Sequence, residues 1–219
     1  FMSNRHDEIE ANLRGVQSEI APFSPTLIVV TKTYPLSDVQ ILRELGVENF
    51  GENRSSEGLE KSALVDGRWH YQGQVQSKKI REISGWADCI HSLDNLGHAE
   101  KFSRTLHEMG ESREFFLQLS LDGDPDRGGL VEAELFTTAT AIQGLPGISL
   151  LGVMCVPPVD MPVDLAFSKI AQIHQKFRGE FPDSPSLSAG MSGDYLIALN
   201  HGATHVRVGS KILGQRQYH

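Results

Sequence analysis

The chain has 219 residues with 20 basic and 28 acidic side chains, which gives a formal net charge of −8 at pH 7. This acidic balance argues against a nucleic-acid surface, which would need a basic face, so we expect no nucleic-acid partner. No apolar stretch approaches the ~20 residues that cross a bilayer, and residues 3–8 are too polar for a signal peptide. Cys89 and Cys155 lie inside apolar runs and fit a reducing compartment. We therefore expect a cytoplasmic protein without membrane contact.

The chain begins with an amphipathic helix, expected over about residues 4–20, in which Ile9, Leu13, Val16 and Ile20 share one face. Short apolar or β-branched runs then recur eight times, at residues 27–33, 48–53, 68–73, 88–94, 114–121, 148–155, 185–191 and 205–209. Segments with helical spacing of apolar residues separate several of these runs, among them residues 39–45, 99–109, 135–142 and 166–177. Strand and helix therefore alternate about eight times.

This alternation is typical of a parallel sheet covered by helices, and eight units in a chain of this length predict an α/β fold with one closed (β/α)8 TIM barrel. Several helical segments end at glycines that suit the left-handed C-cap, namely Gly46, Gly110, Gly144 and Gly202. We treat residues 1–219 as a single domain. An open doubly wound sheet is the alternative, although the turn after the first strand lacks the dinucleotide fingerprint G-x-G-x-x-G.

Lys32 is the only charged residue in the run at 27–33, and it lies near the C-terminal end of that run. Lysine stems often lie along apolar surface with the amine in solvent, so this position alone indicates little. In a closed barrel, however, the last strand pairs with the first, and the active site lies at the C-terminal ends of the strands. Lys32 would then lie beside the loops that follow strands seven and eight.

Those two loops have features of an anion site. Ser192 is placed as the N-cap of a helix that begins with residues 193–195. Gly209 allows close approach of the backbone, and Ser210 offers a hydroxyl and an N–H group. Each feature is common alone, and Arg207 alone would be read as a surface ion pair. Together with Lys32, they predict a phosphate site beside an amine.

Seven segments of the chain resemble, in order, those of the pyridoxal phosphate homeostasis proteins, a family also called YggS or proline synthetase co-transcribed protein. The segments are VTKT (30–33), FGEN (50–53), HYQGQVQ (70–76), HSLD (91–94), GVM (152–154), GMSGD (190–194) and VRVG (206–209). The resemblance extends from about residue 27 to residue 214. It implies a single barrel similar to the N-terminal domain of alanine racemase, which is the type III fold of pyridoxal 5'-phosphate (PLP) proteins.

The resemblance also implies a set of cofactor-binding residues. Lys32 would carry PLP as a Schiff base, and Arg207 would face the pyridine nitrogen. The remaining positions would hold the phosphate (Ser192, Gly209 and Ser210) or line the ring pocket (Asn53 and Met191). Three positions depart from the family pattern: Tyr34 stands where a basic residue is frequent, Lys78 replaces an asparagine, and Ser210 replaces a threonine but keeps the hydroxyl.

These residues favour a PLP carrier over an enzyme. A guanidinium only donates hydrogen bonds, so Arg207 would leave the ring nitrogen unprotonated and the ring a poorer electron sink. In alanine racemase a second base comes from a C-terminal domain and a partner subunit, whereas this chain ends at His219, soon after the eighth strand. We therefore expect no catalytic residue, a monomer, and a role in PLP homeostasis that buffers the cofactor or delivers it to PLP-dependent apoenzymes.

Two enzyme classes are the alternatives. A minimal amino-acid racemase would use His70, Tyr71 or His91 at the strand ends as acids and bases. A Schiff-base aldolase for a phosphorylated sugar would also pair a lysine with a phosphate site. We expect no metal, because Gly202 breaks any helix that would align His201 with His205.

Overall fold

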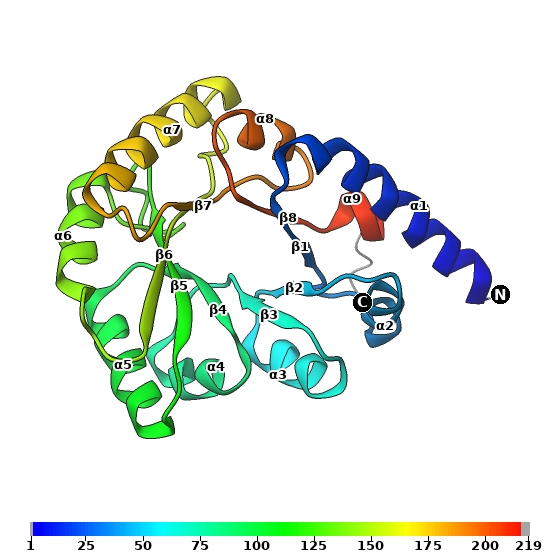
Figure 1. Cartoon of the computed structure of the whole chain (residues 1–219), viewed down its shortest axis with the longest axis horizontal. Coiled ribbons are helices and arrows are strands. Elements are labelled where there is room, and N and C mark those ends of the chain that lie inside the picture. The colour runs from blue at the N-terminus through cyan, green and yellow to red at the C-terminus, as the bar shows by residue number, and fades with distance from the viewer. Residues whose placement is uncertain (1, 216–219) are drawn as a thin grey trace.

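A computed structural model describes residues 2–215, and the structural statements below concern this part of the chain. Eight parallel strands form a closed barrel in sequence order, with helices around the outside (Figure 1). The strands are β1 (Thr26–Val30), β2 (Asn49–Glu52), β3 (Arg68–Tyr71), β4 (Cys89–Leu93), β5 (Arg113–Leu119), β6 (Ile148–Cys155), β7 (Ser186–Ser188) and β8 (His205–Val208). The predicted TIM barrel and all eight of its strands are confirmed.

Helices precede, connect and follow these strands. They are α1 (Met2–Ile20), α2 (Leu36–Glu44), α3 (Ser55–Leu64), α4 (Ile80–Trp86), α5 (Leu96–Met109), α6 (Glu132–Ile142), α7 (Val163–Glu180), α8 (Tyr195–Asn200) and α9 (Ser210–Leu213), with short 3-10 turns at Ala21–Phe23 and Ser77–Lys79. None of the helices in the described residues is long and apolar enough to cross a membrane. The four glycines expected to end helices all have a positive φ, from 68° at Gly110 to 99° at Gly202.

The barrel closes where β1 pairs with β8. Ile28 lies opposite Arg207, and Val29 lies opposite Val208. Beyond the strands, the Tyr34 hydroxyl donates a hydrogen bond to the carbonyl oxygen of Gly214. The loop after the first strand and the loop after the last strand therefore lie side by side at one end of the barrel.

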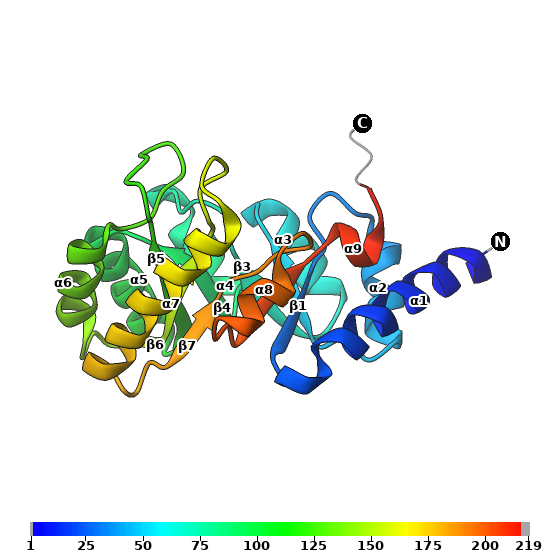
Figure 2. The ribbon, with the colours of Figure 1, turned by 90° about the horizontal axis from the view of Figure 1, so that it is seen from above.

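Helix α1 packs along the outside of the barrel next to α9 (Figure 2). The four apolar residues predicted to share one face of this helix are all buried. Polar contacts add to the packing, because Arg5 Nη2 donates to the Leu213 carbonyl at 2.9 Å and Asn12 Nδ2 donates to the Ile212 carbonyl at 3.0 Å. Helix α1 therefore supports the turn that begins at Ser210.

Apolar side chains fill two regions of the fold. A large cluster lies between the strands and the helices and includes the fully buried Phe50, Phe102 and Phe167. A small cluster of Cys89, Phe116 and Met154 is separate from it and lies inside the barrel. The barrel interior is therefore a packed core, as in other closed eight-stranded barrels.

Candidate functional site

A cavity of about 500 Å³ lies at the C-terminal ends of the strands. Its wall includes all seven residues that the sequence placed in the site: Lys32, Asn53, Met191, Ser192, Arg207, Gly209 and Ser210. These residues come from the segments after β1, β2 and β7, and from β8 and the residues that follow it. Closure of the barrel thus brings the amine and the predicted anion loops to one cavity.

Two backbone N–H groups converge on a single oxygen at one end of this cavity. The N–H groups of Gly209 and Lys211 both donate to Ser192 Oγ, each at 3.2 Å. Ser210 follows Gly209 as the first residue of α9. Convergent backbone donors of this kind suit an anion such as a phosphate group.

The predicted N-cap role of Ser192 is wrong. Helix α8 begins at Tyr195, two residues later than an N-cap at Ser192 requires, and Asp194 precedes its first residue. The Asp194 carboxylate accepts the N–H of Met191 at 2.7 Å, which closes a turn over residues 191–194 and delays the helix. The Ser192 hydroxyl instead accepts hydrogen bonds from the segment after β8.

Arg207 brings a buried positive charge to the cavity. The residue is 5% exposed, and its Nη2 donates to the Cys155 carbonyl at 3.4 Å. Its Nε is buried and has no hydrogen-bond partner among the described residues. Burial lowers the pKa of Arg207 to about 10, which still leaves the guanidinium protonated at neutral pH. An unsatisfied buried donor of this kind favours a ligand that carries an acceptor.

Two acceptors in the wall of the same cavity also lack partners. Asn53 Oδ1 and Gln72 Oε1 are buried and make no hydrogen bond within the described residues. Gln72, Gln74, Gln118 and Arg127 line the cavity too, although the sequence assigned them no role. The signal for Gln72 and Gln74 was present, because both lie in the HYQGQVQ segment, which begins in β3 and continues into the loop after it.

Lys32 is half-buried and lies beyond the end of β1 rather than within it. The strand ends at Val30, and residues 32–34 form a turn before α2. Within this turn Thr33 has a φ of 68°, a left-handed conformation that β-branched residues rarely adopt. The position of the Lys32 amine therefore depends on the contacts that stabilise the turn at residues 32–34.

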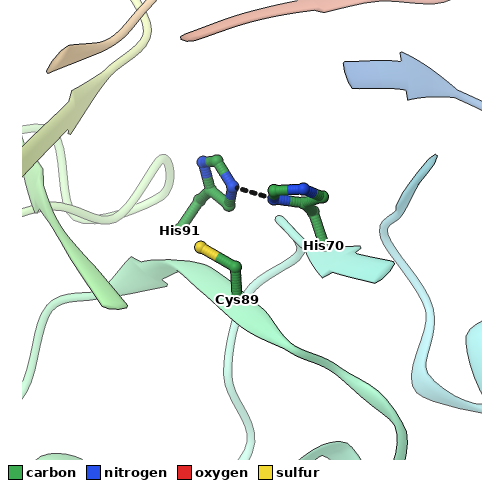
Figure 3. Close-up of side chains that lie close together, drawn as sticks. All are labelled: His70, Cys89 and His91. Carbon is green, nitrogen blue, oxygen red and sulfur yellow. Dashed lines mark hydrogen bonds between the residues drawn. The ribbon is translucent and has the colours of Figure 1, made fainter. Parts of the chain in front are cut away.

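The acid and base candidates of the racemase alternative do not line the cavity. His70 and His91 are buried inside the barrel, where their rings face each other above Cys89 (Figure 3). His70 Nδ1 lies 2.8 Å from His91 Nε2, and the outer nitrogens contact Asn49 Oδ1 at 2.9 Å and Ser188 Oγ at 2.8 Å. Every ring nitrogen of this pair is therefore satisfied by a hydrogen bond.

Cys89 completes a group whose possible metal-ligand atoms lie within 4.8 Å of one another. The facing nitrogens of His70 and His91, however, are occupied by the hydrogen bond between them. Burial also raises the pKa of the Cys89 thiol to about 12, which keeps this thiol protonated. We therefore assign His70 and His91 to a hydrogen-bonded pair in the barrel core and Cys89 to the apolar cluster beside it.

The buried histidines predict a loss of stability in mild acid. Burial lowers the pKa of His70 and His91 well below the ordinary value, and it lowers the pKa of His205 to about 4. A pKa lowered by folding means that the unfolded chain binds more protons, so stability is complete above about pH 6.5 and falls below it. We expect the free energy of unfolding to fall by up to about 1.4 kcal/mol per pH unit for each such group.

Urea unfolding from about pH 7.5 down to about pH 5 measures this effect. A His91→Gln variant should lose part of the pH dependence, whereas His107→Gln, on the exposed face of α5, should keep all of it. A free energy of unfolding that stays constant over this pH range would contradict the prediction.

Comparison with known proteins identifies the family. The sequence matches the family described as alanine racemase, N-terminal domain, over residues 5–217. A pyridoxal phosphate homeostasis protein from Corynebacterium glutamicum is 38% identical over 221 residues, which cover 97% of this chain and 95% of the relative. The chain belongs to the pyridoxal phosphate homeostasis protein family. Another member, from Vibrio alginolyticus, is 31% identical and covers 96% of this chain and 98% of its own.

Solved structures agree with the assignment to the pyridoxal phosphate homeostasis family. PipY of Synechococcus elongatus, solved without PLP, has a TM-score of 0.87 at 32% identity, and the PLP-bound form has a TM-score of 0.86 at 31% identity. Both comparisons cover 94% of this chain and 100% of PipY. Alanine racemase from Clostridium difficile has a TM-score of 0.80 at 15% identity and shares the barrel fold. The resemblance found in the sequence is confirmed.

Proposed function

We propose that this homeostasis-family protein binds PLP in the cavity, with Lys32 as the Schiff-base residue, and buffers or delivers the cofactor. The observation that carries the proposal is that Lys32, the buried Arg207 and the residues of the expected phosphate site, Ser192, Gly209 and Ser210, line one cavity. The names of the relatives and the PLP-bound structure of PipY support it.

The polar atoms of the cavity wall fit this ligand. PLP carries a phosphate, a ring nitrogen, a hydroxyl and an aldehyde, which together need both donors and acceptors. The wall offers acceptors of Asn53 and Gln72 and a donor of Arg207 that have no partner within residues 2–215. Ser192, Gly209 and Ser210 are the proposed phosphate ligands, and Met191 and Asn53 are proposed to flank the ring. Once bound, the cofactor supplies a reactive aldehyde conjugated to an electron-withdrawing ring.

A carrier role is favoured over catalysis by the residues around the ligand. Arg207 stays protonated at neutral pH and only donates hydrogen bonds, so it leaves an acceptor nitrogen without a proton. An unprotonated ring stabilises a substrate carbanion poorly. In addition, His70 and His91 are not part of the cavity wall and are hydrogen-bonded to each other. These features support a protein that binds PLP over an enzyme that converts an amino acid.

We also propose that the protein acts as a monomer in the cytoplasm and passes PLP to PLP-dependent apoenzymes. The residues that we propose to bind PLP all lie in one chain, which supports a monomer. Cys89 and Cys155 are free thiols and are buried, which suits a reducing compartment.

Titration with PLP, followed by borohydride reduction and peptide mass mapping, tests the proposal. We expect a visible absorption band, which reduction removes, and a single stable adduct on the peptide that contains Lys32. A colourless protein that borohydride traps only with an added sugar phosphate would instead favour the aldolase alternative. Steady turnover of an amino acid that depends on Lys32 would establish an enzyme.

A further inference from the structure

A buried network of three charged side chains lies next to Lys32 but outside the cavity wall. Lys61 Nζ lies 2.8 Å from Glu52 Oε1 and 2.7 Å from Glu57 Oε2. Glu52 is fully buried and Lys61 is 6% exposed. Burying charges costs desolvation free energy that ion pairing often only balances, so a buried network is weak evidence of added stability. Its other contacts indicate a different role.

These contacts hold the backbone on both sides of Lys32. On the N-terminal side, Lys61 Nζ donates to the Thr31 carbonyl at 2.7 Å, and the Thr31 hydroxyl donates to Glu52 Oε1 at 2.7 Å. On the C-terminal side, the N–H of Thr33 donates to Glu57 Oε2 at 2.7 Å. The residue before Lys32 and the residue after it are therefore bound to the same network.

The turn needs this support because its backbone is strained. The φ of 68° at Thr33 is a left-handed conformation that is unfavourable for a residue other than glycine. Such a conformation persists only where surrounding contacts impose it. The hydrogen bond from Thr33 to Glu57 is a contact of this kind, and the ion pair with Lys61 fixes Glu57 in turn.

We propose that Lys61 and Glu57 of α3 are positioning residues that direct the Lys32 amine into the cavity. The inference rests on the proposed function of Lys32. Neither side chain lines the cavity, so both act through the backbone of residues 31–33. Loss of either contact would let the turn relax and would move the amine away from its reaction geometry, while the phosphate loops after β7 and β8 keep their own contacts.

Two ligands separate this role from general support of the fold. PLP has the aldehyde that reacts with an amine, whereas pyridoxine 5'-phosphate has the same ring and phosphate but an alcohol in its place. For Lys61→Met and Glu57→Ala, we expect PLP affinity to fall on the order of tenfold, because a misplaced amine forms the Schiff base less favourably. The affinity for pyridoxine 5'-phosphate should change by less than about twofold, since its binding needs no such geometry.

Matched variants on the same helix serve as controls. Glu60→Ala, on the exposed face of α3, should leave both affinities unchanged. Glu57→Gln keeps a carbonyl oxygen for the Thr33 N–H and should restore most PLP binding relative to Glu57→Ala. Thermal melts establish that each variant is folded. If Lys61→Met does not fold, the Glu57→Ala variant, at a half-buried position, provides the test.

The results distinguish this inference from the function on which it rests. Equal losses for both ligands would assign the network to the fold alone and overturn the inference, as would unchanged PLP affinity in Glu57→Ala. A wild-type protein that binds the two ligands equally would reject the proposed role of Lys32 itself.

Discussion

Replacement of Lys32 by alanine is expected to abolish the visible absorption band that forms with PLP and to weaken PLP binding by at least about tenfold, which corresponds to about 1.4 kcal/mol. Only an amine forms a Schiff base with the aldehyde, and Lys32 is the lysine that lines the cavity in the described part of the chain. Absorption titrations of both proteins measure the effect. Lys78→Ala removes an exposed lysine of Ser77–Lys79 and should behave like the wild type.

The Lys32→Ala variant should still recognise the phosphate. The convergent N–H groups of Gly209 and Lys211 and the buried Arg207 belong to β8 and the residues that follow it. We therefore expect affinity for pyridoxine 5'-phosphate close to that of the wild type. A visible band that survives in Lys32→Ala would show that another amine carries the aldehyde and would refute the assignment.

Alanine at Gly152 is expected to destabilise the fold by on the order of 3 kcal/mol or more. A Cβ at this position would lie 1.8 Å from the Ser186 carbonyl oxygen and 2.6 Å from its carbon. Gly152 and Ser186 are partners in the register of β6 and β7, so the clash involves backbone that cannot move without breaking the ladder. For a chain of this size, the midpoint of thermal unfolding should fall by about 6–12 °C.

Gly179→Ala provides the matched control for this prediction. Gly179 lies near the end of α7, and a Cβ there meets no atom within 4 Å. Its thermal midpoint should stay the same or rise slightly, because alanine favours helix over glycine. A Gly152→Ala protein with the same thermal midpoint as the wild type would contradict the prediction and would show that β6 and β7 can move apart at little cost. Since β7 leads directly to Ser192, binding of pyridoxine 5'-phosphate should also weaken in Gly152→Ala.

The sequence predicted β1, β4, β5 and β6 well because these strands are mostly apolar, as is usual for parallel strands that are covered on both sides. It identified α3 and α4 less well, because α3 buries no apolar stripe and α4 is short. The buried positions of α3 are Ser55, Gly58 and Lys61, and α4 has only seven residues. Close packing explains the glycine, because a Cβ at Gly58 would lie 2.2 Å from the Trp86 ring. A helix that buries small and charged residues has no apolar stripe to recognise.

The site residues also differ in how well the sequence predicts them. The residues of the segments after β1 and β7 and of β8 were found because barrel closure and seven ordered motifs pointed to them. Lys61 and Glu57 were missed, because charged residues four apart on a helix are ordinarily a solvated pair. Only the structure shows that this pair is turned inward toward Thr31 and Thr33. The role of Ser192 also depended on where α8 begins, which a single residue type does not determine.

The pairing of β1 with β8, where the barrel closes, gives a bound ligand a role in stability. Lys32 follows the first of these strands and Ser210 follows the last, so one small molecule held by both joins the two ends of the ring. Separation of β1 from β8 then requires the bound molecule to dissociate. Free ligand therefore disfavours this opening by mass action. A loaded protein should accordingly protect the amide hydrogens of β1 and β8 from exchange more than those on the opposite side of the ring.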